Sequence, residues 1–546
     1  MSTAAPYAES TEEKATHLSE VETDGDRAGT SIAAQLKTWH PSRGHKSIAA
    51  SLFPTFSFDK GIDPTTGGPL TKNPIKLLRG MSPMGWAMFF SGWFCWTCDG
   101  YDYFAVSLTT KELAAQFGKD TADITLAITL TLLFRSLGAV IFGLLADRYG
   151  RKWTLVINTL LICVFELGSG FANTYAQFLG IRAMFGIVMG GIWGQAAATG
   201  LENAPVHMRG FLSGVLQQGY AVGYLLAAVI NLTVVQYSPY TWRSLYFIGA
   251  GFSLAAAIVR ALLPESQQFI LAREEAKASG VSGKAATKAF GHEIKQMLKT
   301  NWMRCIWAIM IMTGFNFFSH GSQDLYPTYL QTTKFLTAKQ ASKVTIISNV
   351  GAIVGGTFGG YISQYMGRRA AILMGLVWTA CWIPLWILPK SFAGLAAGGF
   401  WLQSGVQGCW GIVPIYLAEI SPPAFRASFG GLAYQLGNMA SAGSAQIEAT
   451  AGKTLKLKGI TDKTGAAIPD YAAIMGILIG CVIAWMLVWT ILGPDADGSH
   501  FEQAKVAFQS GAGETTTTAL VEKHDREHVE NLPEVRRSTD QQHTIA

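Results

Sequence analysis

Twelve apolar runs, each close to the ~20 residues that a helix needs to cross a bilayer, restrict the fold of this sequence more than any other feature. The first six runs cover 84–108, 122–146, 153–171, 175–199, 210–232 and 244–263, and the second six cover 302–321, 344–361, 370–388, 392–417, 427–447 and 471–492. The sequence therefore predicts an all-α membrane protein with twelve transmembrane helices.

The composition agrees with insertion into a lipid bilayer. Charged residues make up 14% of the 546-residue chain, whereas soluble proteins typically contain about 25%. The net charge of +6 is spread over loops and tails, so we expect no nucleic-acid-binding surface. Cys95 and Cys98 lack the four ligands of a structural zinc site, and the sequence contains no phosphate-binding loop. We therefore expect no metal and no cofactor.

An internal repeat divides the chain into two halves. GLLADRYGRK at 143–152 recurs as GYISQYMGRR at 360–369, an offset of 360 − 143 = 217, and Glu202-x-x-Pro-x-x-x-Arg209 recurs at the same offset as Glu419-x-x-Pro-x-x-x-Arg426. Parallel repeats of this kind predict a substrate site at the membrane midplane, between two halves that rock against each other. We expect these six-helix halves at 81–263 and 301–493.

The segments outside the halves are polar. Residues 1–80 and 494–546 lack a sustained apolar period, which predicts disordered tails, and the charged segment 264–300 is expected to link the halves. An even number of helices places both tails on one side of the membrane. Arginines in the short loops favour the cytoplasmic side, so both termini and the linker are predicted to be cytoplasmic.

The loop at 143–152 resembles the signature between the second and third helices of the major facilitator superfamily, whose doubled six-helix layout this sequence shares. The resemblance implies that charged residues of the short loops close the cytoplasmic side by ion pairs. The alternative is that they only direct insertion, for which lysine and arginine suffice. The candidate gating residues are Asp147, Arg148, Arg151, Glu202, Arg209, Arg368, Glu419 and Arg426.

A polar stripe at 316–328, reading NFFSHGSQDLYPT, follows the seventh apolar run. His320 and Asp324 are one helical turn apart, on one face with Asn316. Ionisable groups at membrane depth are costly, so their default interpretation is a substrate or proton path. Histidine changes charge near neutral pH, and a neighbouring aspartate favours its protonated form. We hypothesise that His320 with Asp324 carries or senses a proton; the alternative is a hydrogen-bond cluster that holds helices together.

The same stretch resembles the motif of the fungal Jen-type lactate/pyruvate:proton symporters. The matching positions are Asn316, Ser319, His320, Ser322, Gln323, Asp324 and Thr328. The resemblance implies a plasma-membrane symporter, expected to be a monomer, that imports small monocarboxylates such as lactate and pyruvate, with acetate as a further candidate. Two alternatives stay open: a dicarboxylate or other organic-acid symporter, and a transporter-like nutrient sensor, which would carry a long folded signalling domain. An enzyme is disfavoured.

Arg135 interrupts an apolar run near its middle and is the best candidate to anchor a carboxylate, because a guanidinium can bind one through two hydrogen bonds. The alternative is a permanent ion pair with Asp99, Asp102 or Glu166. The repeat offset maps Asp99 onto Asn316 and Asp102 onto Ser319, which makes both aspartates candidate proton acceptors opposite the motif. Three glutamines could line the cavity or bond helices together: Gln217, Gln218 and Gln435.

Overall fold

The described part of the chain is almost entirely helical. The computed structural model describes residues 74–494 with gaps at 203, 205–207, 236, 266–268, 271–272, 275–282 and 462–466. The predicted disordered tails therefore lie outside the described residues, except for 74–80 and Pro494. Helix α4 (Pro74–Arg79) directly precedes the first long helix.

The first half contains six predicted spans, and two of them are interrupted. The fourth divides into α9 and α10 around Gly190 and Gly191, and the fifth divides into α11 and α12 at Gln218. The bounds are α5 (Pro83–Leu108), α6 (Thr110–Phe117), α7 (Thr121–Tyr149), α8 (Arg151–Phe171), α9 (Tyr175–Met189), α10 (Ile192–Glu202), α11 (Arg209–Gln217), α12 (Gly219–Ile230), η2 (Asn231–Val235) and α13 (Arg243–Leu262).

The second half repeats this order and adds a hairpin before its last helix. Helix α15 (Gly283–Thr300) forms the end of the predicted linker. The half itself comprises α16 (Trp302–Gln323), α17 (Tyr326–Thr332), α18 (Ala338–Met366), α19 (Arg368–Ile387), α20 (Phe392–Trp410), α21 (Val413–Ile420), η3 (Pro423–Phe425), α22 (Arg426–Ser441), α23 (Ser444–Thr454), β1 (Lys456–Thr461), β2 (Ala467–Pro469) and α24 (Tyr471–Ile491). Strands β1 and β2 pair antiparallel, and the sequence analysis did not anticipate them.

The 217-residue repeat is visible in the helix bounds. Moving α7 by 217 residues gives 338–366, which are the bounds of α18. Both helices end at a glycine with positive φ, 103° at Gly150 and 84° at Gly367. Glycine adopts this conformation without the steric cost of a Cβ, so the chain turns there directly into the next helix.

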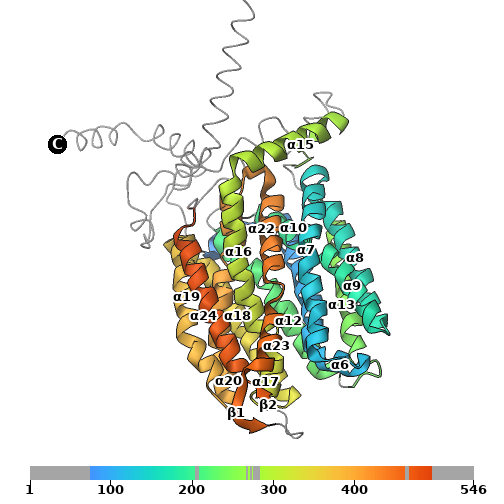
Figure 1. Cartoon of the computed structure of the whole chain (residues 1–546). Helices are drawn as coiled ribbons and strands as arrows, with labels where there is room; N and C mark the ends of the chain where they lie inside the picture. Colours follow the sequence, from blue (N-terminus) through green and yellow to red (C-terminus); the bar gives the residue numbers. More distant parts are fainter. Residues whose placement is uncertain are drawn as a thin grey trace, which may run out of the picture.

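Helices of the two halves pack directly against each other. Helix α7 packs on α22, and α18 packs on α11 and α12, as a twofold relation between the halves requires. Helix α15 lies at one end of the bundle, and α6, α17 and the β1–β2 hairpin lie at the other (Figure 1). We call these the linker end and the hairpin end.

Eight helical spans in the described part of the chain are long and apolar enough to cross a membrane by themselves: 123–149, 151–171, 175–201, 209–235, 243–262, 338–366, 368–387 and 471–491. The other predicted spans correspond to α5, α16, α20 with α21, and α22 with α23. Helices α5 and α16 carry Asp99 and His320, and α22 carries Gln435, all of them buried. The least apolar spans therefore bring polar side chains to the interior.

Candidate functional site

A polar cluster links the two halves through His320. Its Nδ1 atom lies 3.1 Å from Oδ2 of Asp324 and 3.2 Å from the hydroxyl of Tyr103, and that hydroxyl donates to Asp324 at 3.0 Å. On the other side of the ring, Nε2 lies 3.0 Å from Oδ1 of Asn438. Tyr103 comes from α5 in the first half, whereas the other three residues belong to the second half. All four side chains are buried.

Hydrogen bonds through the side-chain amides of Gln435 and Asn438 determine which nitrogen of His320 carries a hydrogen. Nε2 of Gln435 donates to the carbonyl of Gly190 at 3.3 Å, and Oε1 of Gln435 accepts from Nδ2 of Asn438 at 2.7 Å. A carbonyl oxygen can only accept, so Oδ1 of Asn438 faces the ring as an acceptor. His320 must therefore donate through Nε2. A second proton would lie between Nδ1 and Asp324.

Arg135 of α7 pairs with Asp99 of α5 inside the first half. The distance from Nη2 to Oδ2 is 2.9 Å, and both side chains are fully buried. Nε and Nη1 of Arg135 have no hydrogen-bond partner among the described residues. The guanidinium also lies 5.8 Å from the ring centre of Tyr434 in the second half. An ion pair with Asp99 was one of the partnerships considered from sequence, and it leaves N–H donors of Arg135 unused.

A second buried ion pair lies deeper in the first half. Arg182 of α9 donates to Glu166 of α8 at 2.8 Å. Asp102 accepts from Ser253 of α13 at 3.0 Å, and its carbonyl accepts from Arg182 at 3.4 Å. Glu166 and Asp102, both considered as partners for Arg135, are thus engaged with α9 and α13. Arg182 itself was missed, although it interrupts an apolar run just as Arg135 does.

The remaining motif residues bond mainly within the second half. Asn316 donates to carbonyls of Met312 and Tyr434 at 2.8 and 3.2 Å. Gln323 donates to Gln403 at 2.8 Å, and Gln403 donates in turn to the hydroxyl of Ser322 at 3.1 Å. Ser319 is buried beside them. In this conformation these side chains fix α16 against α20 and α22.

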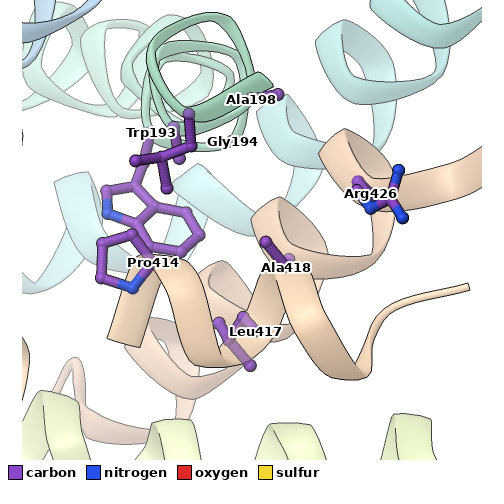
Figure 2. A pocket seen from close by; sticks show the side chains of 10 residues that line it. Trp193, Gly194, Ala198, Pro414, Leu417, Ala418 and Arg426 are labelled. Atoms are coloured by element: carbon purple, nitrogen blue, oxygen red, sulfur yellow. The ribbon is translucent and has the colours of Figure 1, made fainter. Parts of the chain in front are cut away.

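A pocket opens between the halves at the linker end. Figure 2 shows Trp193 and Gly194 of α10 facing Pro414 and Leu417 of α21, with Arg426 farther along the wall. Trp193 stacks on Tyr434 with ring centres 4.8 Å apart. Since Tyr434 also contacts Arg135, these two rings separate the pocket from the guanidinium.

A second pocket lies between the halves at the hairpin end. Thr328 of α17 and Asn231 at the start of η2 contribute to its wall. Lys111 of α6 crosses between the halves and donates to Gln331 of α17 at 2.9 Å. Partial burial lowers the pKa of Lys111. The polar cluster of His320 lies in the interior between the two pockets.

The predicted gating residues gather at the linker end. Asp147 at the end of α7 accepts a hydrogen bond from the backbone N–H of Ser428 in α22, at 3.1 Å, and another from its hydroxyl. Arg368 binds Glu419 through two hydrogen bonds of 2.9 and 2.8 Å, both residues being in the second half.

The structure also describes contacts of three other members of the set. Arg148 lies over the ring of Tyr149 at 4.9 Å, Arg209 donates to the carbonyl of Ala204 at 3.1 Å, and Arg426 lines the linker-end pocket. Arg151 begins α8. The side chain of Glu202 lies outside the described residues.

Three further site residues escaped the sequence analysis: Tyr103, Asn438 and Gln403. Tyr103 could have been found by subtracting 217 from His320, and Asn438 by continuing one helical turn from Gln435. No signal in the sequence singled out Gln403. Within the described residues, no three His, Cys, Asp or Glu side chains come together as metal ligands.

Known proteins with similar sequences are transporters. Residues 73–508 match the family model described as "Sugar (and other) transporter". The chain is 34% identical over 432 residues to the carboxylic acid transporter protein homolog of Saccharomyces cerevisiae, covering 77% of this chain and 70% of that protein. It is 25% identical over 349 residues to the cis,cis-muconate transport protein of Acinetobacter baylyi, covering 63% and 82% of the two chains.

The fold is also similar to solved structures. A structure of the proton:xylose symporter XylE, bound to 6-bromo-6-deoxy-D-glucose, aligns with a TM-score of 0.59 at 18% identity. The alignment covers 77% of this chain and 98% of XylE. At this identity the likeness shows that the fold is shared.

Proposed function

The chain belongs to the sugar (and other) transporter family of the major facilitator superfamily, whose members are transporters rather than enzymes, and we propose that it imports small monocarboxylates together with a proton. Lactate and pyruvate are the proposed substrates. The proposed location is the plasma membrane, with the linker end and both termini on the cytoplasmic side.

The observation that carries this proposal is the unused hydrogen-bonding capacity of Arg135. Its guanidinium is fully buried and pairs with Asp99 through one nitrogen, while Nε and Nη1 have no partner among the described residues. Each of these donors shares one of the two edges of the planar guanidinium with Nη2, the nitrogen that Asp99 engages, and a carboxylate can accept a hydrogen bond from either of them. A carboxylate bound there would satisfy donors that are otherwise costly to bury.

The His320 cluster supplies the proposed proton site. The hydrogen bonds that run from the Gly190 carbonyl through Gln435 and Asn438 require a hydrogen on Nε2 of His320. A second proton is therefore shared between Nδ1 of His320 and the Asp324 carboxyl group, 3.1 Å apart. The cluster thus has a state with this proton and a state without it. One proton per monocarboxylate makes inward transfer electrically neutral, so the membrane potential does not oppose uptake of the anion.

Tyr103 and Tyr434 connect the two sites to the motion of the halves. Tyr103 joins the first half to His320 and Asp324, and Tyr434 joins the second half to Arg135. Either a proton at His320 or a carboxylate at Arg135 therefore changes contacts that cross between the halves. The pockets at the linker end and the hairpin end support the proposal that each surface has access to the site in turn.

A dicarboxylate is the second candidate substrate. The muconate relative is named for a dicarboxylate, but Arg182, the next buried guanidinium of the first half, already donates to Glu166 and to the Asp102 carbonyl. A second carboxylate at Arg182 would have to compete with Glu166 for the guanidinium. The monocarboxylate therefore fits the available donors better.

Uptake into proteoliposomes tests the proposal. The full chain is reconstituted, an inward proton gradient is imposed, and accumulation of labelled lactate, pyruvate and succinate is followed together with the internal pH. We expect lactate and pyruvate to accumulate with internal acidification, and dissipation of the gradient to abolish this accumulation. Preferential uptake of succinate would favour the dicarboxylate, and absence of gradient-driven uptake of all three acids would refute the proposal.

A further inference from the structure

Glu448 is a buried carboxyl group that the sequence analysis did not consider. It lies in α23, its side chain is fully buried, and neither carboxyl oxygen has a hydrogen-bond partner among the described residues. An ionised carboxylate buried without donors is very costly, and such a group is instead held in its neutral, protonated form. The structure therefore describes a conformation in which Glu448 holds a proton.

The surroundings place Glu448 between the hairpin end and the His320 cluster. Leu325, which follows Asp324, packs against Ala445 and Ala449 on either side of Glu448 in sequence. The carboxyl groups of Asp324 and Glu448 are close enough to interact electrostatically. On the opposite side, the ring of Tyr471 lies against Gly452, one turn farther along α23.

The groups around Glu448 favour proton exchange over a permanent ion pair. The titratable groups that interact with it electrostatically are Asp324 at the end of α16 and Tyr471 at the start of α24, and neither can be a positive partner. Helix α7 contributes Thr125, which donates to Gln446 at 2.9 Å. The hydroxyl of Ser444, one turn before Glu448, is buried and also lacks a partner among the described residues. It is available to donate when Glu448 loses its proton.

We propose that Glu448 is a proton-binding site that supplies the His320–Asp324 pair from the hairpin end. In this step the O–H bond of Glu448 breaks, its proton passes to the Asp324 carboxylate, and Glu448 becomes a carboxylate stabilised by Ser444. A hydronium ion from the solution at the hairpin end then gives its proton to Glu448 and is left as water. The inference rests on the proposed proton-coupled function. It adds a site that binds the proton before the His320–Asp324 pair does.

Glu448→Gln tests this step, because the amide resembles the protonated acid and cannot release a proton. In proteoliposomes we expect gradient-driven accumulation of lactate and lactate-dependent proton entry to fall at least about tenfold, as for loss of a positioned proton donor. Exchange of labelled for unlabelled lactate without a gradient should persist. Glu448→Asp, which keeps a titratable group, should restore part of the coupling, and Gln446→Ala serves as the control on the same helix.

Two results would overturn the inference: full coupling in Glu448→Gln, or equal loss of exchange and coupling in both Glu448 variants, which would indicate a structural role. Infrared spectroscopy gives a readout independent of transport. A carbonyl band of protonated carboxylic acids should be present in the wild type and lose intensity in Glu448→Gln, and an unchanged band in the variant would also overturn the inference. Failure of gradient-driven uptake in the wild type would instead refute the proposed function, while the infrared comparison still tests Glu448.

Discussion

Tyr103 and His320 occupy equivalent positions of the 217-residue repeat, and their side chains meet, with the tyrosine hydroxyl 3.2 Å from Nδ1. The local twofold relation between the halves therefore passes close to this contact. The first half contributes the hydroxyl of Tyr103, and the second half contributes the imidazole of His320 with Asp324. The two contacting positions are related by the repeat, but their side chains differ chemically. Tyr103 thereby places the opposite half in direct contact with the proposed proton site.

Tyr103→Phe should impair coupling more than folding. The change removes a donor to Asp324, and hydrogen bonds to charged groups contribute about 1.5–3 kcal/mol. We expect slower proton-driven lactate uptake and a shifted pH profile, measured in proteoliposomes. Tyr101→Phe is the matched control, because among the described residues its hydroxyl donates to the Leu245 carbonyl within the first half. Equal effects of the two variants would contradict a special role for Tyr103.

Arg135→Lys should weaken substrate binding while keeping the positive charge. The lysine can still pair with Asp99, but it lacks the Nε and Nη1 donors, which have no partner among the described residues. Loss of one charge-assisted bond corresponds to roughly tenfold to hundredfold lower affinity, measurable by equilibrium binding of labelled lactate. Arg182→Lys is the comparison, since Arg182 is already paired with Glu166. Unchanged affinity in Arg135→Lys would mean that the ion pair with Asp99 is the only role of Arg135.

The sequence was sufficient to predict the transmembrane helices and their duplication, because apolar length and a fixed offset are local, repeated signals. It also singled out Arg135 and His320, since a charge inside an apolar run stands out wherever the run lies, and both side chains are buried. Arg182 also lies inside an apolar run, so the same criterion predicts a second buried charge, which the structure pairs with Glu166.

Partnerships across the bundle could not be predicted in the same way. Asp99, Asp102 and Glu166 were equivalent candidates for Arg135, and only packing distinguishes them, by directing Glu166 to Arg182 and Asp102 to Ser253. The breaks inside the fourth and fifth spans were missed for a related reason. Hydropathy averages over a window and does not register a local break such as that at Gln218.

Trp193→Ala should open the linker-end pocket toward Arg135. Trp193 lines this pocket and stacks on Tyr434, which contacts the guanidinium. We expect faster dissociation of bound labelled lactate in detergent, measured by rapid filtration, with Arg135 still able to bind it. Trp410→Ala is the control, because Trp410 is the repeat counterpart and packs edge-on against Tyr434 without lining the pocket. Faster release in both variants would indicate general loosening of the core.

Glu419→Gln should destabilise the protein. It would leave Arg368 buried without the carboxylate that accepts two of its hydrogen bonds. Removing one partner of a buried ion pair costs about 3–5 kcal/mol, whereas replacing both by apolar residues is often neutral. Thermal unfolding in detergent should show a clearly lower midpoint for Glu419→Gln and recovery in the double variant Arg368→Met, Glu419→Leu. A single variant as stable as the wild type would show that the pair is not an important structural contact.

Ser428→Asp should bias the protein toward a conformation open at the linker end. Asp147 accepts bonds from both the N–H and the hydroxyl of Ser428, and these bonds join α7 of the first half to α22 of the second. A carboxylate at position 428 would face Asp147 with like charge, and the repulsion is relieved when the two helices separate. We expect a cysteine placed at Gly194, in the linker-end pocket, to react faster with a charged thiol reagent in this variant. Ser428→Asn, which has similar size and no charge, should react like the wild type. Equal labelling of the aspartate and asparagine variants would show that this contact does not control closure of the linker end.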